Sequence, residues 1–89
     1  MEFQHESGRI FALDGDGKLI AEVTFPTTDG VADIDHTFVD ASLRGQGVAG
    51  KLLAAAAEQI RADGLKAKAT CSYAVKWFDQ HPEEQDLLK

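Results

Sequence analysis

Residues 43–52 read LRGQGVAGKL, a glycine-rich stretch between segments of regular pattern. Residues 45–50 have the spacing G-x-G-x-x-G of dinucleotide-binding turns, and residues 45–51 fit G-x-x-x-x-G-K, the start of a nucleoside-triphosphate P-loop. Residues 44–49 fit a third phosphate-binding pattern, R-x-x-G-x-A. Each pattern belongs to a different class of protein, so the chain on either side must decide between them.

Three β-prone segments precede the glycines, at residues 9–13, 18–25 and 31–39. Two Asp-Gly pairs at residues 14–17 predict a turn after the first segment, and residues 27–30 predict a second turn. Sequential strands joined by short turns predict an antiparallel meander with one face toward water. The third segment alternates, so that one of its faces is expected to carry Ala32, Ile34, His36 and Phe38.

A helix and a fourth strand follow the glycines. Apolar residues recur at helical spacing from Val48 to Ile60, and Gly64 is placed to end that helix in a left-handed conformation. Residues 65–71 return to a period of two, with lysines on the face opposite small residues. The glycine stretch therefore joins a predicted antiparallel strand to a predicted helix.

Two short helices are expected at the end of the chain. Ser72 is the expected cap of the first, which carries the expected core residues Trp77 and Phe78. Pro82 is placed to begin the second. The order β-β-β-α-β-α-α predicts one compact α/β domain of the α+β type over residues 1–89.

The flanking elements exclude two of the phosphate-binding patterns. A dinucleotide turn follows a nearly all-apolar strand, whereas Asp33 and Asp35 interrupt the strand before these glycines. A P-loop needs Ser or Thr after its lysine to hold Mg²⁺, and Leu52 stands at that position. Both folds also need several βαβ units of about 30 residues or more each, which a chain of 89 residues does not accommodate comfortably.

Composition narrows the function classes further. A formal net charge of −6 without a basic stripe argues against nucleic-acid binding, and no apolar run approaches the roughly 18–20 residues of a membrane span. The N-terminal residues lack the apolar core of a signal peptide, and the single cysteine suits a reducing compartment, so a cytoplasmic location is expected. His5, His36 and His81 do not form a ligand pattern, and no metal is expected.

An antiparallel strand that leads through R-x-x-G-x-A into a helix is the arrangement of the GNAT acetyltransferases. Residues 36–37, 43–49 and 67–73 extend this likeness and resemble the short YjdJ-type N-acetyltransferases, a branch of the GNAT superfamily. The resemblance runs over about residues 31–82. It implies a compact GNAT-like core, acetyl-coenzyme A as co-substrate and an amine acceptor that it does not identify.

The resemblance also implies where the co-substrate binds. Free N–H groups and the positive end of a helix can hold a pyrophosphate, to which an arginine adds charge-assisted hydrogen bonds. Backbone N–H groups around Phe38 and Val39 are candidates to polarise the thioester carbonyl, with the pantetheine arm in a gap beside the strand that ends at Cys71. The expected phosphate-binding residues are Arg44, Gly45, Gln46, Gly47, Val48, Ala49, Gly50 and Lys51.

Three side chains are candidates for the chemistry. The resemblance places Cys71 near the thioester, where a thiolate could accept the acetyl group, and a small core residue is the alternative interpretation. His36 is either a hydrogen-bonded structural residue or a base. Tyr73 either packs or protonates the departing coenzyme A thiolate.

A second class of function stays open at this point. The N-terminal helical segment that usually builds the acceptor site of larger GNAT enzymes has no counterpart in this sequence. A non-catalytic module that senses coenzyme A or acyl-coenzyme A is therefore the alternative to an N-acetyltransferase. The assembly is left open between a monomer and a weak homodimer.

Overall fold

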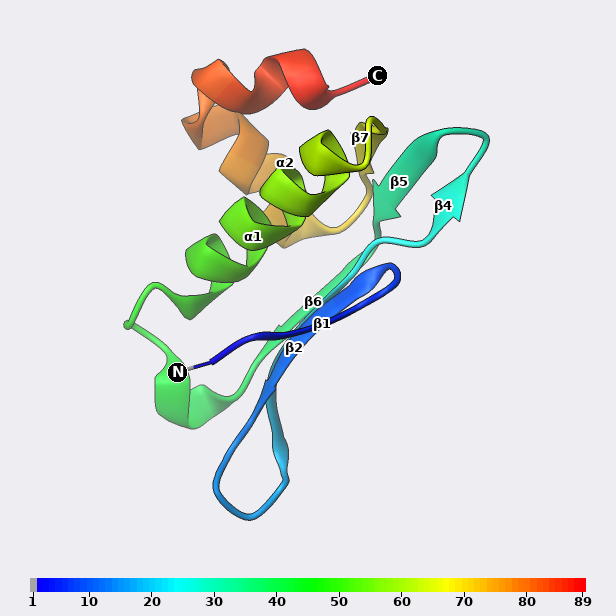
Figure 1. The fold of residues 1–89 in the computed structure, drawn as a ribbon. Coiled ribbons are helices and arrows are strands. Elements are labelled where there is room, and N and C mark those ends of the chain that lie inside the picture. The colour runs from blue at the N-terminus through cyan, green and yellow to red at the C-terminus, as the bar shows by residue number, and fades with distance from the viewer. Residues whose placement is uncertain (1) are drawn as a thin grey trace.

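The computed structural model describes residues 2–89, in which strands form two sheets and the helices lie together beside them (Figure 1). The strands are β1 (Gln4–Glu6), β2 (Arg9–Leu13), β3 (Leu19–Thr24), β4 (Thr27–Thr28), β5 (Val31–Ile34), β6 (His36–Val39) and β7 (Lys66–Ala69). The helices are the 3₁₀-helix η1 (Ala41–Leu43), α1 (Val48–Ala62), α2 (Ser72–Gln80) and the 3₁₀-helix η2 (Pro82–Leu87).

The larger sheet has the strand order β1-β2-β3-β6 and is antiparallel throughout. This confirms the predicted meander, because β2, β3 and β6 each pair with the next. The smaller sheet has the order β4-β5-β7, in which β5 and β7 run parallel. The sequence did not indicate β1. Thr27–Thr28 form β4 instead of lying in the expected turn, which is confined to Asp29 and Gly30 with φ angles of 53° and 79°.

The segment predicted as one strand, residues 31–39, is two strands that belong to different sheets. The break lies at Asp35, whose N–H donates to the Thr24 carbonyl at 3.2 Å. His36 is also the register partner of Thr24. Two residues therefore oppose one, which is the arrangement of a β-bulge. The bulge directs β5 toward β7 and β6 toward β3.

The bulge also shifts the alternation of side chains by one residue. Ile34 is fully buried, but beyond the bulge Thr37 and Val39 lie opposite buried residues of β3, while His36 and Phe38 are exposed. The expectation that His36 and Phe38 share the face of Ile34 is therefore wrong. We call the side of the larger sheet away from α1 the outer face; it carries Arg9, Glu22, Thr24, His36 and Phe38.

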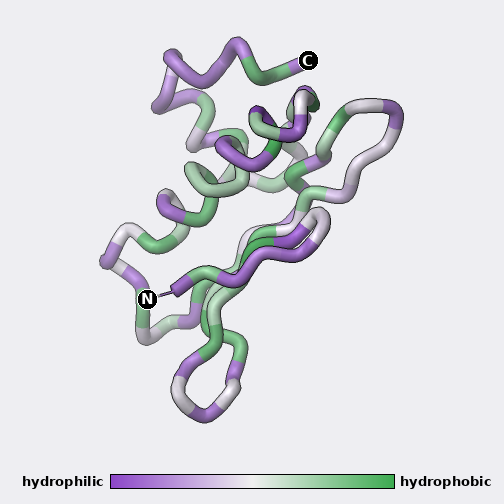
Figure 2. Tube along the Cα trace, in the orientation of Figure 1, coloured by the Kyte–Doolittle hydropathy of each residue, from purple (hydrophilic) through white to green (hydrophobic). Residues whose placement is uncertain are grey.

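The core lies between α1 and the sheets. Figure 1 shows α1, α2 and η2 on one side, with α1 running along the strands, and α1 packs against strands of both sheets. The predicted core residues Trp77 and Phe78 of α2 are buried. Figure 2 shows hydrophobic residues along the central strands and α1, whereas the β2–β3 loop and η2 are mostly hydrophilic. The buried face of α1 consists of Val48, Leu52, Leu53, Ala56, Ala57 and Ile60.

The ends of the helices agree with the sequence in part. Gly64 follows α1 with a φ of 71°, as predicted. Cys71, and not Ser72, is the N-cap of α2, because the Cys71 Sγ accepts the N–H of Ala74 at 3.3 Å. The last helix begins at Pro82, but it is a 3₁₀-helix instead of an α-helix.

Candidate functional site

The glycine turn leads directly into α1. Gly45 and Gly47 have φ angles of 84° and 71°, in the left-handed region that glycine adopts without strain. Gly47 is the N-cap residue, and its carbonyl accepts the N–H of Lys51 at 3.1 Å. Beyond the neighbouring residues and the backbone of the same helix, a Cβ atom added at Gly45, Gly47 or Gly50 would meet no atom within 4 Å. The turn is therefore open on the side from which a ligand would approach.

Backbone N–H groups at the start of α1 have no partner within the helix. The hydrogen bond from the Lys51 N–H to the Gly47 carbonyl is the first of the helical pattern. The N–H groups of Val48, Ala49 and Gly50 therefore have no acceptor within the helix. They lie at the positive end of a helix of 15 residues. The Val48 side chain is buried in the core, so its contribution to a ligand is limited to its backbone. The arrangement can hold an anionic group.

The polar side chains around the turn also favour an anionic ligand. Arg44, Gln46 and Lys51 are exposed, and the Gln46 amide donates to the Ser42 carbonyl at 3.5 Å. Ion pairs among the described residues use other cations, including Lys18. Arg44 and Lys51 are therefore available to an anion bound at the helix N-terminus.

Asp40 stabilises the loop between β6 and the turn. Its carboxylate accepts the Ser42 hydroxyl at 2.6 Å and the Ser42 N–H at 3.1 Å. The hydroxyl hydrogen bond, followed by the N–H hydrogen bond, lowers the pKa of Asp40 below its ordinary value. The ionised carboxylate thus holds η1 and orients the chain that enters the glycine turn.

A row of backbone N–H groups borders the open edge of β6. The strand pairs only with β3, and the N–H of Asp40 at its end donates to the Ile20 carbonyl of β3 at 2.8 Å. Successive N–H groups of a strand point to opposite sides. The N–H of Phe38 therefore points toward β3, whereas those of Thr37 and Val39 point to the unpaired side.

Strand β7 leaves this side open because it ends at the bulge. The N–H groups of Thr70 and Cys71 both donate to the Ile34 carbonyl, at 3.1 and 3.2 Å, and the chain then enters α2. We use the term gap for this interruption of strand pairing between β6 and the end of β7. The resemblance to GNAT enzymes predicts that the pantetheine arm lies beside the strand that ends at Cys71, which is this side of β6. Of the two expected donors, Phe38 and Val39, only Val39 has an N–H that faces the gap. The sequence did not indicate Thr37 as a donor, because it did not reveal the bulge that turns the Thr37 N–H toward the gap.

Cys71 lies at the inner side of the gap. Its Sγ is 3.4 Å from the Thr37 Oγ1 and also caps α2. The side chain is partly buried and free of any disulfide. Cys71 therefore combines a structural role with a position beside the β6 edge, so that both interpretations of this residue have a structural basis.

The other two candidates lie apart from the thiol. His36 is on the outer face, with its Nε2 3.3 Å from the Glu22 Oε1, while the Thr37 side chain that contacts Cys71 is on the inner face. Tyr73 is 47% exposed, so it does not serve the core. The structure thus brings Thr37 and Cys71 together and separates His36 from them by the thickness of the strand.

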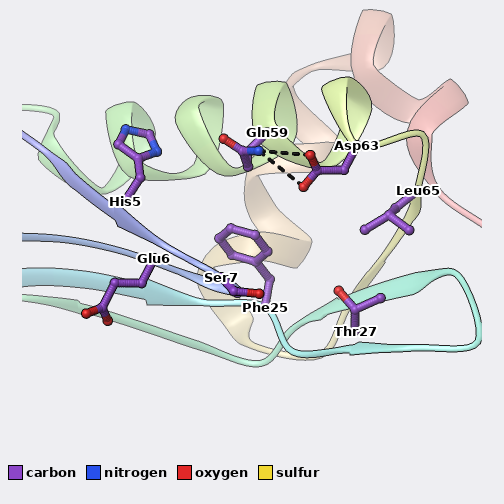
Figure 3. A pocket seen from close by; sticks show the side chains of 9 residues that line it. His5, Glu6, Ser7, Phe25, Thr27, Gln59, Asp63 and Leu65 are labelled. Carbon is purple, nitrogen blue, oxygen red and sulfur yellow. Dashed lines mark hydrogen bonds between the residues drawn. The ribbon is translucent and has the colours of Figure 1, made fainter.

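A hollow of about 380 Å³ lies elsewhere, between β1 and the C-terminal half of α1 (Figure 3). His5 borders it on one side, and Gln59 and Asp63, joined by hydrogen bonds of 3.0 and 3.1 Å, border it on the other. Phe25 forms an apolar part of its lining. None of the residues expected from the sequence to act on acetyl-coenzyme A lines this hollow.

Metal-binding groups of side chains and membrane-spanning helices are both absent from residues 2–89. No group of His, Cys, Asp and Glu side chains in residues 2–89 is arranged to hold a metal ion. No helix within that range has the length and apolar character needed to cross a membrane.

Comparison with solved structures finds the same fold. The solution structure of a protein from Staphylococcus aureus classed as a GCN5-like N-acetyltransferase superposes with a TM-score of 0.80 at 34% identity, covering 99% of this chain and 87% of the other. A crystal structure from Agrobacterium tumefaciens classed as an acetyltransferase has a TM-score of 0.68 at 25% identity, covering 90% of this chain and 58% of the other.

Sequence comparison identifies the family. The protein NATD1 of Gallus gallus is 37% identical over 57 residues, which are 64% of this chain and 52% of the relative, so the match spans about half the length of that protein. NATD1 of Homo sapiens matches over the same number of residues. The family model for GCN5-related N-acetyltransferases matches residues 9–87. The chain therefore belongs to the GCN5-related N-acetyltransferase family.

Proposed function

We propose that this chain binds acetyl-coenzyme A and transfers the acetyl group to an amine. One observation carries the proposal: two sets of unpaired backbone N–H groups, at the start of α1 and on the free edge of β6, are joined by one short loop. The first set suits a pyrophosphate and the second suits amide and thioester carbonyls. The pantetheine arm of acetyl-coenzyme A joins the pyrophosphate at one end to the thioester at the other, with amides between them.

The pyrophosphate would lie on the N–H groups of Val48, Ala49 and Gly50. Open space beside the glycines lets the backbone approach it closely. Arg44 and Lys51 would add charge-assisted hydrogen bonds to outer oxygens. This assignment accommodates an anionic ligand on a protein of net charge −6 because the positive groups are local to the turn.

The pantetheine arm would run along the edge of β6. There the Val39 N–H can donate to an amide carbonyl of the arm, and the Thr37 N–H, beside Cys71, can donate to the thioester carbonyl. A donor aimed at that oxygen stabilises the negative charge that develops when the carbonyl is attacked. Thr37 therefore replaces Phe38 in the role expected from the sequence.

Two routes for the acetyl group fit this arrangement. In the first, the neutral amine attacks the thioester carbon, the C–S bond breaks and the nitrogen loses one proton to water, while coenzyme A leaves as a thiolate that Tyr73 or water protonates. In the second, the Cys71 thiolate attacks the thioester carbon and coenzyme A leaves as a thiolate. The amine then attacks the new thioester and loses one proton to water, which releases the Cys71 thiolate. The position of Cys71 beside Thr37 makes the second route geometrically accessible.

Thermal unfolding with and without ligand tests binding. A ligand at a hundredfold excess over its dissociation constant stabilises a one-site protein by about 2.7 kcal/mol. We expect the unfolding temperature to rise with coenzyme A and acetyl-coenzyme A, and to stay constant with NAD or with ATP and Mg²⁺. Equal shifts with all of these ligands would contradict the proposed site.

A sensor that binds acyl-coenzyme A without turnover is the second candidate. It is favoured by the outer face, which no helix of residues 2–89 covers (Figure 1), so these residues enclose no acceptor there. Incubation with acetyl-coenzyme A and a panel of primary amines, followed by mass spectrometry of the amines, separates the two. Binding without any acetylated amine would favour the sensor.

A further inference from the structure

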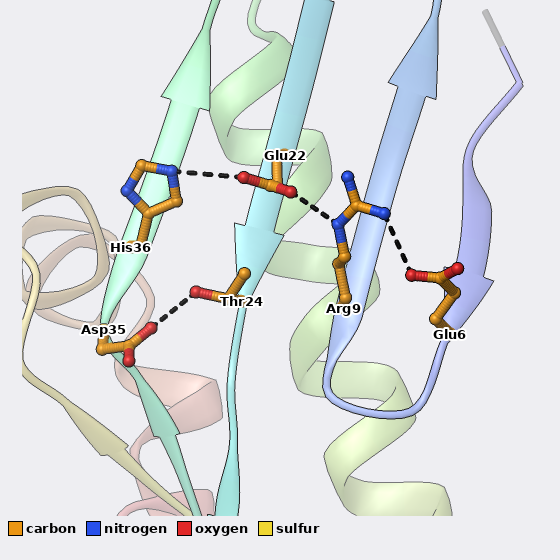
Figure 4. A network of polar contacts seen from close by, with 6 residues as sticks. All are labelled: Glu6, Arg9, Glu22, Thr24, Asp35 and His36. Carbon is orange, nitrogen blue, oxygen red and sulfur yellow. Dashed lines mark hydrogen bonds and ion pairs between the residues drawn. The ribbon is translucent and has the colours of Figure 1, made fainter. Parts of the chain in front are cut away.

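A chain of polar side chains crosses the outer face from β1 to β6 (Figure 4). Arg9 lies at its centre and donates from Nη1 to the Glu6 Oε1 at 2.9 Å and from Nε to the Glu22 Oε2 at 2.5 Å. The guanidinium also lies over the Phe11 ring, 3.9 Å from its centroid. The second oxygen of Glu22, Oε1, is 3.3 Å from the His36 Nε2. One carboxylate thus connects a fixed cation to an imidazole.

The two ends of this connection differ in exposure. The Glu22 side chain is 15% exposed and that of His36 is 54% exposed. An ionised carboxylate only accepts hydrogen bonds, so the tautomer of a neutral His36 ring that suits this contact is the one with its proton on Nε2. The lone pair then lies on Nδ1, on a ring that solvent and solutes can reach.

His36 directly precedes the residue proposed to hold the thioester carbonyl. Successive residues of a strand are about 3.3 Å apart and point to opposite faces, so His36 stands on the outer face beside the Thr37 N–H. Cys71 lies on the opposite, inner side of the gap. An acceptor that approaches from the uncovered outer face therefore meets the carbonyl next to the imidazole.

We propose that Glu22 is a positioning residue for acetyl transfer: held by Arg9, it fixes the His36 ring with the proton on Nε2, so that Nδ1 takes a proton from the acceptor. The inference rests on the proposed function. The acceptor arrives as an ammonium ion and gives one proton to Nδ1, and its nitrogen then attacks the thioester carbon. As the C–S bond breaks, the nitrogen loses a second proton and the departing sulfur gains one, which leaves an amide, coenzyme A as a thiol and a protonated His36.

Three variants test the role of Glu22. Glu22→Gln keeps the shape of the side chain but removes its charge. Glu6→Gln is the matched control, because Glu6 binds the same arginine without contacting His36. His36→Ala assigns the His36 ring signals and removes the base. Each protein is examined by long-range ¹H–¹⁵N spectra of the histidine rings and by steady-state transfer to primary amines.

We expect a single Nε2–H tautomer of His36 in the unmodified protein and in Glu6→Gln, and a mixture of tautomers in Glu22→Gln. A general base contributes about 10²-fold or more to the rate, so kcat should fall by about that factor in His36→Ala and about tenfold in Glu22→Gln. The KM for acetyl-coenzyme A should not change. Added imidazole should restore part of the activity of His36→Ala but none in Glu22→Gln, where the ring is still present.

The outcomes separate the two proposals. A His36 ring that carries its proton on Nδ1, that has no fixed tautomer in the unmodified protein, or that does not respond to Glu22→Gln would overturn the positioning role. Transfer by the unmodified protein with an unchanged kcat in Glu22→Gln would overturn only this inference. Binding of acetyl-coenzyme A without transfer to any amine would overturn the proposed function, and the catalytic role of His36 with it.

Discussion

The N-terminus of α1 and the free edge of β6 both present backbone N–H groups without partners, yet they arise in different ways. At α1 the cause is local, because Gly45 and Gly47 adopt positive φ angles and start a helix whose first N–H groups have no acceptor. At β6 the cause is a bulge, at which Asp35 and His36 share one partner on another strand. The first region is encoded by residue types, and the second by pairing between distant segments.

This difference separates the expected effects of substitutions. Side chains and glycines of the turn should control affinity for coenzyme A, whereas backbone groups of β6 should control the rate of transfer. A variant of either region that changes both the affinity for coenzyme A and the rate of transfer would contradict this separation of roles.

The largest effect is expected for Thr37→Pro. Proline removes the N–H proposed to hold the thioester oxygen, and loss of one such donor lowers kcat by about 10²- to 10³-fold in other enzymes. Because this N–H faces the unpaired edge of β6, the hydrogen bonds to β3 remain and the fold should persist. Thr37→Val is the control, since it keeps the N–H and loses only the Oγ1 contact with Cys71. Similar rates for both variants would move the oxyanion donor to another residue.

A smaller effect is expected for Arg44→Ala. The variant removes a charge-assisted hydrogen bond, which contributes about 1.5–3 kcal/mol. Because Arg44 is exposed, we expect a loss at the lower end of this range, which raises the dissociation constant of coenzyme A about tenfold. The kcat at saturation should not change. Titration calorimetry at two salt concentrations measures the loss, with Lys76→Ala on α2 as a matched exposed cation. An equal loss in both variants would show general attraction instead of a site.

Substitutions of Cys71 should change stability by less, and they separate its two roles. Cys71→Ala removes the cap of α2 and should lower the free energy of unfolding by about 0.5 kcal/mol, while Cys71→Ser keeps an acceptor there. If the thiol accepts the acetyl group, the unmodified protein gains one acetyl mass that hydroxylamine removes, and neither variant does. Full transfer by Cys71→Ser would show that the amine attacks acetyl-coenzyme A directly.

The smallest effect concerns the loop that joins the two regions. The hydrogen bonds from Ser42 lower the pKa of Asp40 below 3.8, so their contribution to stability is complete above that pH and is lost as the pH falls through the folded-state value. Asp40→Asn should therefore unfold at a lower temperature than the unmodified protein at pH 7, and the difference should shrink below about pH 3.8. A constant difference in thermal scans across this range would exclude the carboxylate as the cause.

The sequence was informative where structure depends on neighbouring residues. Glycine spacing predicted the turn, Gly64 ended α1, and apolar spacing identified the core residues Trp77 and Phe78. The sequence did not predict the bulge, because the pattern of residues 31–39 is consistent with one continuous strand. The bulge becomes visible only in the hydrogen bond from the Asp35 N–H to the Thr24 carbonyl. For that reason three features required the structure: the outward position of His36, the Thr37 N–H on the unpaired side of β6, and the contact of His36 with Glu22.

The sulfur that caps α2 couples chemistry to the helix. Any group bonded to the Cys71 Sγ, whether acetyl or oxygen, competes for the space and lone pair that now receive the N–H of Ala74. Helix α2 begins at that bond and carries Trp77, the only tryptophan of the chain, whose ring stacks on His81 at 4.4 Å. Modification of the thiol would therefore loosen the first turn of α2, the helix that carries Trp77. The tryptophan fluorescence of the protein would then change when a group is bonded to the Cys71 sulfur.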